Sequence, residues 1–194
     1  MFQVRIHGRG GQGVVTAAEM LSVAAFDEGR YAQAFPSFGS ERMGAPVVAF
    51  CRMDTREIRL REPVMRPDAL IIQDATLLHQ VDLFAGLPSD GYILINSTRS
   101  LGELGLEDLL ARHSMERVCT VAASELAMRH LGRPLPNAAL LGGFAAITGQ
   151  LSIGSVAGAI HAKFSGKVSE ANVAAARAAF ESVLESLARS KAHA

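Results

Sequence analysis

Cysteine, tryptophan and lysine are scarce in this chain. It has two cysteines, no tryptophan and three lysines among its 194 residues, and its formal net charge at pH 7 is zero. Cys51 and Cys119 lie far apart and form no CxxC pair, which argues against a disulfide framework. Neither the cysteines nor the six histidines have the spacing of metal ligands. We therefore expect a cytoplasmic protein that holds no metal or iron–sulfur cluster by itself.

The basic residues are scattered along the chain. Nineteen lysines and arginines are balanced by 19 acidic residues, and no basic run or stripe is visible. A site for nucleic acid or for a membrane surface needs such a cluster of positive charge. We therefore expect neither partner.

One long stretch, residues 137–160, has no charged residue and could span a bilayer by its length. Five glycines, two serines and Gln150 interrupt it, so two buried segments joined by a turn are the better interpretation. The first residues, MFQVRI, predict a strand and no signal peptide.

Apolar strands alternate with helices along the chain, which predicts an α/β fold. Residues 47–53 and 57–62 predict an antiparallel hairpin around residues 54–56. We therefore expect one domain over residues 1–194, with a mostly parallel, mixed sheet and helices on both faces. The other expected strands are 4–7, 30–35, 68–74, 91–97 and 116–124, and the expected helices are 14–28, 125–132 and 169–191.

A glycine-rich loop follows the first expected strand. The sequence VRIHGRGGQGVVTAAEML places it before an alanine-rich helix, as in Rossmann-like loops. Backbone N–H groups of such a loop can approach a phosphate at a helix N-terminus, or the glycines can simply allow a tight packing corner. The candidate binding residues in the loop are Gly8, Arg9, Gly10, Gly11, Gln12 and Gly13.

The spacing of Gly8, Gly10 and Gly13 fits a dinucleotide fingerprint, but the rest of the fingerprint is missing. An acidic residue should end the second strand, where this chain has Phe35 and Pro36. The loop also has no lysine, so it is not a P-loop. Nicotinamide binding is therefore disfavoured.

A series of segments resembles the gamma subunit of 2-oxoacid:acceptor oxidoreductases, which include the pyruvate and related 2-ketoacid:ferredoxin oxidoreductases. The resemblance begins with GRGGQGVVTAAEML and continues through YAQAFPSFGSERMGAPVVAFCRM, DALIIQD and NAALLGG. It covers nearly the whole chain.

The resemblance implies a role within a multi-subunit enzyme. Such enzymes decarboxylate a 2-oxoacid on thiamine diphosphate, pass electrons through iron–sulfur clusters and transfer the acyl group to coenzyme A. The family's thiamine, Mg and cluster sites belong to alpha, beta and ferredoxin-like delta partners, and ferredoxin or NAD accepts electrons through them. This chain would supply scaffold and part of the coenzyme A path.

The motif GSERMGAP carries two further candidates that the resemblance implies. Arg42 occupies a position associated with the coenzyme A phosphates, and Ser40 lies beside it. A guanidinium suits phosphate oxygens through bidentate bonds, although Arg42 could instead pair with Glu41 or a partner subunit. Glu41 departs from relatives that carry a second basic residue there.

Several other polar residues have structural alternatives. Arg9 could bind an anion or form an inter-subunit salt bridge, and Gln12 could form a hydrogen bond within its turn. Asp74 and Asn137 fit helix N-caps, while Asn96 ends an apolar strand. His7 ends the first expected strand, where a buried histidine with satisfied hydrogen bonds is the ordinary finding.

Aromatic residues are dense in one segment. Tyr31, Phe35 and Phe38 lie within eight residues and, together with Arg42, predict a surface buried against a partner subunit. A free-standing nucleotide-binding or regulatory module without an enzyme partner is the alternative to the subunit interpretation.

Overall fold

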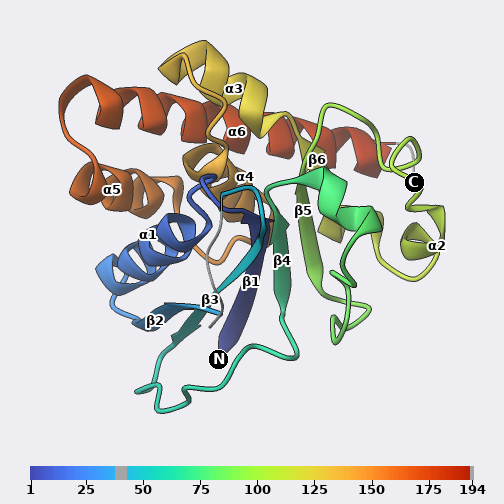
Figure 1. Ribbon diagram of the computed structural model, residues 1–194, viewed down its shortest axis with the longest axis horizontal. Helices are drawn as coiled ribbons and strands as arrows, with labels where there is room; N and C mark the ends of the chain where they lie inside the picture. Colours follow the sequence, from blue (N-terminus) through green and yellow to red (C-terminus); the bar gives the residue numbers. More distant parts are fainter. Residues whose placement is uncertain (38–42, 193–194) are drawn as a thin grey trace.

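A six-stranded sheet forms the centre of the protein, in the order β2-β3-β1-β4-β5-β6 (Figure 1). The computed structural model describes residues 1–37 and 43–192. The strands are β1 (Phe2–Arg9), β2 (Tyr31–Pro36), β3 (Pro46–Asp54), β4 (Ala69–Ile72), β5 (Tyr92–Asn96) and β6 (Val118–Val121). The helices are α1 (Val14–Asp27), α2 (Glu107–Leu110), α3 (Ala123–Leu131), α4 (Asn137–Thr148), α5 (Ile153–Lys163) and α6 (Gly166–Ala192), with short 3₁₀ helices η1 (Ala75–His79) and η2 (Met115–Arg117).

The sheet is mixed and mostly parallel, as the sequence predicts. Strands β1, β4, β5 and β6 pair in parallel, with Val4 opposite Ala69 at the first junction. Strand β3 pairs antiparallel with both β1 and β2. The antiparallel part of the sheet is therefore made by the first three strands alone.

The predicted hairpin over residues 47–62 is wrong. Strand β3 forms as expected, but residues 57–62 are not a strand. Both edges of β3 are already occupied, by β1 and β2, so no edge is left for a hairpin partner. The segment instead runs beside the sheet, where the carbonyl of Glu62 accepts a hydrogen bond from Arg52 Nη2 at 2.6 Å.

Helices cover both faces of the sheet, unevenly. The long helices α1, α4, α5 and α6 form one core with the inward side chains of the sheet, such as Ile6 and Ile71. Figure 1 shows α3, α5 and α6 gathered on this side. On the opposite face, Ile72, Ile93 and Ile95 pack under η1 and the loops around α2. The predicted α/β architecture is confirmed.

The uncharged stretch over residues 137–160 forms two helices, as expected. Helix α4 is buried on nearly every side and packs between the sheet and α6, while α5 begins after a turn at residues 149–152. No helix within the described parts of the chain is long and apolar enough to cross a membrane.

Two ionisable side chains of β1, Arg5 and His7, are buried. His7 is buried as expected, but its Nε2 has no hydrogen-bond partner within the described residues. Burial, assisted by the nearby charge of Arg5, lowers the pKa of His7 to about 3. The Arg5 guanidinium donates to the carbonyls of Leu83 and Ala85, each at 2.8 Å. Arg5 therefore fixes a distant loop to the sheet, and His7 stays neutral beside it.

His7 should make the protein less stable in mild acid. The unfolded chain takes up a proton near pH 6.5 and the folded chain only near pH 3, so stability falls as the pH drops through this window. We expect a loss of about 2 kcal/mol between pH 7 and pH 5 from this residue. Urea unfolding at both pH values measures this loss of unfolding free energy. The loss should be smaller for His7→Gln than for the wild type, whereas the exposed control His79→Gln should lose as much as the wild type. Equal losses in all three proteins would contradict this account.

Candidate functional site

The glycine loop lies at the carboxyl end of β1, between that strand and α1. Gly13 occupies the N-cap position with φ of 71°, a left-handed conformation that glycine adopts without strain. Among the described residues no side chain caps α1, and its first turn contains no acidic residue. The positive end of the helix dipole at this point is therefore not neutralised by the helix's own side chains.

A network of polar side chains fixes the conformation of the loop. Gln12 Oε1 accepts a hydrogen bond from the Arg9 backbone N–H at 2.8 Å, which confirms the predicted bond within the turn. Gln12 Nε2 donates to Asp74 Oδ2 at 2.9 Å, and Arg9 Nε lies 3.2 Å from the same oxygen. Partial burial raises the pKa of Asp74, but hydrogen bonds from Thr76 and Gln12 and the charge of Arg9 outweigh it, so the pKa is lowered overall. Asp74 is therefore held as a carboxylate that ties the loop to η1.

Arg9 joins three parts of the chain. Its Nη2 donates to Thr76 Oγ1 at 2.7 Å and to Gln80 Oε1 at 2.9 Å, and its Nη1 donates to the carbonyl of Gly44 at 3.0 Å. Its ion pair is with Asp74, within the chain. The contact of Arg9 with an anion or a partner subunit stays a prediction.

Two glycines of the loop allow close packing. A Cβ atom on Gly8 would lie 2.6 Å from Val14 Cγ2, and one on Gly13 would lie 2.6 Å from Asn137 Nδ2. The packing-corner interpretation of the loop is therefore supported by its geometry. Within the loop, the N–H groups of Arg9, Gly10 and Gln12 donate to acceptors in the same chain.

The chain returns to the glycine loop after β2. The Gly10 N–H donates to the Ala45 carbonyl at 2.9 Å, and the Gly44 N–H donates to the Gly10 carbonyl at 3.1 Å. Ser40 and Arg42, the candidates that precede this contact, lie outside the described residues. A cavity of about 430 Å³ adjoins the loop and is lined by Arg9, Gly10, Gly11, Gly13, Val14, Val15, Thr16, Pro36 and Val47.

Polar residues that follow the other parallel strands serve mainly to hold elements together. Asp74 caps η1 as predicted, accepting from the Thr76 N–H at 3.0 Å. Asn96 joins β5 to α3, because its Oδ1 accepts from the Ser124 N–H at 3.0 Å. The N-cap prediction for Asn137 is wrong by one position: Pro136 already has helical backbone angles, so Asn137 is the first residue of α4.

Both cysteines are buried in strands, Cys51 in β3 and Cys119 in β6. Burial raises the pKa of the Cys51 thiol to about 12 and also raises that of Cys119. Both are therefore thiols at neutral pH. Residues 1–37 and 43–192 contain no group of three or more histidine, cysteine, aspartate or glutamate side chains placed to hold a metal ion.

Comparison with known proteins relates nearly the whole chain to one family. Residues 3–182 match the pyruvate ferredoxin/flavodoxin oxidoreductase family. Pyruvate synthase subunit PorC of Methanosarcina barkeri is 51% identical over 162 residues, which cover 84% of this chain and 86% of that protein. The common subunit gamma of the pyruvate/ketoisovalerate oxidoreductases of Pyrococcus abyssi is 47% identical over 181 residues, covering 93% and 96%.

Solved structures show the same fold. Pyruvate oxidoreductase subunit PORC of Thermotoga maritima has a TM-score of 0.77 at 34% identity, over 93% of this chain and 95% of that chain. The 2-oxoglutarate:ferredoxin oxidoreductase of Magnetococcus marinus, solved with 2-oxoglutarate, coenzyme A and succinyl-CoA bound, has a TM-score of 0.67 over 97% of this chain and 31% of its own. At 16% identity that second likeness is one of fold alone.

Proposed function

Since this chain belongs to the pyruvate ferredoxin/flavodoxin oxidoreductase family and is a gamma subunit of a pyruvate or 2-oxoacid:ferredoxin oxidoreductase, we propose that it supplies scaffold and part of the coenzyme A path. The complex decarboxylates a 2-oxoacid with thiamine diphosphate and iron–sulfur clusters, which we assign to partner subunits. The acyl group then passes to coenzyme A. The two buried cysteines, in separate strands, are consistent with clusters held elsewhere.

The uncapped start of α1 is the observation that carries the coenzyme A proposal. The first turn of the helix has no acidic residue, no side chain in the described part of the chain caps it, and a cavity lined in part by Gly10, Gly11 and Gly13 lies beside it. Helix N-termini of this kind bind phosphate groups through their free N–H groups and the helix dipole. Coenzyme A carries three phosphates, so part of it suits this position.

The proposed contacts are those that the family resemblance implies. Within residues 8–13, the backbone of Gly11 and Gly13 at the start of α1 would face the phosphates, since the N–H groups of the residues between and before them already donate within the chain. Arg9 and Gln12 would hold the loop in shape through Asp74. Ser40 and Arg42 would complete the phosphate contacts from the segment outside the described residues. That assignment rests on the resemblance.

We assign the partners as alpha, beta and ferredoxin-like delta subunits, with ferredoxin or NAD receiving electrons through them in the cytoplasm. Apolar side chains near β2 are available for such an interface: Tyr31 is 53% exposed and Phe26, on the adjoining α1, is 72% exposed. Phe35 instead packs on Phe50 within the chain, at 5.2 Å between ring centroids. Phe38 lies outside the described residues.

Purification of the tagged chain from its native host tests the proposal. We expect companion chains that carry thiamine diphosphate and iron–sulfur clusters, and 2-oxoacid-dependent dye reduction that requires coenzyme A. The chain purified alone should show no such activity. Recovery of the chain without companions would favour a free-standing module and contradict the proposal, as would turnover by the isolated chain.

A further inference from the structure

Strand β2 forms one edge of the sheet, and no strand in the described part of the chain pairs with its outer side (Figure 1). Exposed edges pair readily with other strands, and proteins usually protect them with charges, bulges or covering segments. Strand β2, with the sequence YAQAFP, has neither a charge nor a bulge, and none of its residues is buried. Only Pro36, at its end, interrupts the edge. The strand is therefore open to pairing with another chain.

The register of β2 on β3 shows which backbone groups face outward. The Ser37 N–H donates to the Val48 carbonyl at 2.8 Å, and the residues that bond to β3 alternate along β2 from this point. Ala32 and Ala34 lie between those residues, so their N–H and C=O groups point away from β3. Among the described residues, no hydrogen bond outside the β2–β3 ladder uses these groups. Two donors and two acceptors are therefore available along the edge.

A second copy of β2 satisfies these groups best in one register. When two copies run antiparallel with Gln33 opposite Gln33, Ala32 of each chain lies opposite Ala34 of the other, and both residues can donate and accept. An axis at Ala34 would instead place Ala32 opposite Pro36, which has no N–H. An axis at Ala32 would place Ala34 opposite Arg30, whose N–H already donates within its own chain. The hydrogen-bonding groups therefore favour an axis at Gln33.

The side chains of β2 also suit this register. Tyr31 of one chain lies opposite Phe35 of the other, and aromatic cross-strand pairs stabilise antiparallel strands. Any charge at a two-fold axis faces its own copy and is repelled, and β2 places no charge there. On the other face of the strand, α1 packs on β2, and its Val23 and Phe26 are exposed. The apolar surface therefore extends beyond the strand itself.

We propose that two copies of this chain associate through β2, antiparallel about a two-fold axis at Gln33, so that their sheets join into one. The proposal assigns the edge of β2 to a second gamma subunit, and it does not rest on the coenzyme A role. The paired strands are short and cover only part of the roughly 800 Å² per partner that a standard interface buries. We therefore expect the isolated chain to form a dimer of micromolar affinity.

Sedimentation equilibrium of the full chain tests the association. At about 100 µM the wild type should be mainly dimeric. Ala34→Pro should be monomeric, because it removes an outward N–H from the edge without breaking a hydrogen bond to β3. Tyr31→Glu should weaken the dimer about tenfold, because it removes the aromatic pair from both sides of the axis.

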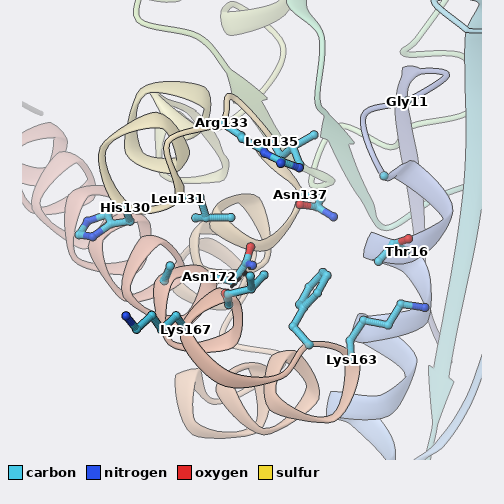
Figure 2. A pocket seen from close by; sticks show the side chains of 14 residues that line it. Gly11, Thr16, His130, Leu131, Arg133, Leu135, Asn137, Lys163, Lys167 and Asn172 are labelled. Carbon is cyan, nitrogen blue, oxygen red and sulfur yellow. Dashed lines mark hydrogen bonds between the residues drawn. The ribbon is translucent and has the colours of Figure 1, made fainter.

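The matched control is Val168→Glu, which places the same charge on an apolar side chain of equal exposure. Val168 is 55% exposed and Tyr31 is 53% exposed. Val168 belongs to α6, which Figure 1 shows far from β2, and it lines a cavity of about 630 Å³ between α1 and α6 together with Arg133, Lys163 and Lys167 (Figure 2). This variant should dimerise as the wild type does. Thermal unfolding verifies that each variant is folded.

Introduced cysteines test the register. Both native cysteines are buried, so an introduced cysteine supplies the accessible thiol. Opposite residues of a non-hydrogen-bonded antiparallel pair have Cα atoms about 4.5 Å apart, which a disulfide can span. Gln33→Cys should therefore cross-link two chains in mild oxidant. Tyr31→Cys should not, although Tyr31 is more exposed, because the two copies of residue 31 are separated by roughly 13 Å along the strands.

Three results would overturn the proposal. They are a wild-type monomer at about 100 µM, a dimer that Ala34→Pro leaves intact, and equal cross-linking of the two cysteine variants. A monomer whose Ala34→Pro variant also fails to join its companion subunits would assign the edge to one of those subunits instead. None of these measurements uses coenzyme A, so their failure is distinct from failure of the proposed coenzyme A role.

Discussion

Replacing Gly142 by alanine should destabilise the protein by about 3 kcal/mol or more. Helix α4 crosses α6 at this residue, and a Cβ atom there would lie 1.9 Å from the backbone oxygen of Ala176. Backbone cannot rotate aside as a side chain can, so one helix would have to shift in the middle of the core. The intrinsic gain in helix propensity from glycine to alanine, about 1 kcal/mol, is too small to offset this.

The adjacent residue provides a matched control. A Cβ atom on Gly143 would lie 3.1 Å from Leu94 Cδ2 and 3.4 Å from Val183 Cγ2, both at the ends of side chains that can adjust. Gly143→Ala should therefore change the free energy of unfolding by about 1 kcal/mol or less. Urea unfolding of the two variants at the same pH measures the difference. Equal unfolding midpoints would show that α4 does not approach α6 as closely as described.

Local patterns were enough to predict most of the elements. The helix after the glycine loop, the helix that ends at Gly132 and the division of residues 137–160 into two helices all follow from periodicity and from glycine positions. Strand β4, with Asp74 capping the turn after it, follows from an apolar run that ends in a polar residue. The α/β class then follows from the alternation of these elements.

Pairing between distant strands could not be predicted in the same way. The alternating pattern of EIRLRE is typical of a strand, but whether a strand forms depends on a free edge of the sheet. Strand β3 has none, because it lies between β1 and β2. No local sequence pattern indicates that residues 46–54 form a strand between β1 and β2.

The contacts of the candidate site also fall into those that local sequence predicts and those that only the folded chain creates. The bond between Gln12 and Arg9 spans three residues and was predictable from the turn. The contact of both residues with Asp74 spans more than 60 residues and depends on β1 lying beside β4. The approach of Asn137 to Gly13, and the gathering of Arg133, Lys163 and Lys167 around one cavity, likewise exist only in the folded chain.

Replacing Arg42 by alanine in the assembled enzyme should raise the apparent KM for coenzyme A about ten- to a hundredfold. A hydrogen bond to a charged group contributes roughly 1.5–3 kcal/mol, which corresponds to this range. The phosphates lie far from the reactive thiol, so the half-reaction that releases electrons from the 2-oxoacid without coenzyme A should change much less. Arg42→Lys should recover only part of the loss, because an ammonium group cannot form the bidentate pair.

The controls separate binding from assembly. Arg59→Ala removes an exposed arginine that pairs with Glu57, and it should leave both reactions unchanged. If Arg42 instead holds a partner subunit, Arg42→Ala should dissociate the complex or reduce every partial reaction together.

The most direct test of the proposed coenzyme A role compares two rates in the same preparations of wild-type, Arg42→Ala, Arg42→Lys and Arg59→Ala complexes. One is the overall reaction as a function of coenzyme A concentration, and the other is the half-reaction without coenzyme A. We predict an intact Arg42→Ala complex with a raised KM for coenzyme A and a nearly normal half-reaction. An intact complex whose dependence on coenzyme A is unchanged would contradict the phosphate role of this subunit.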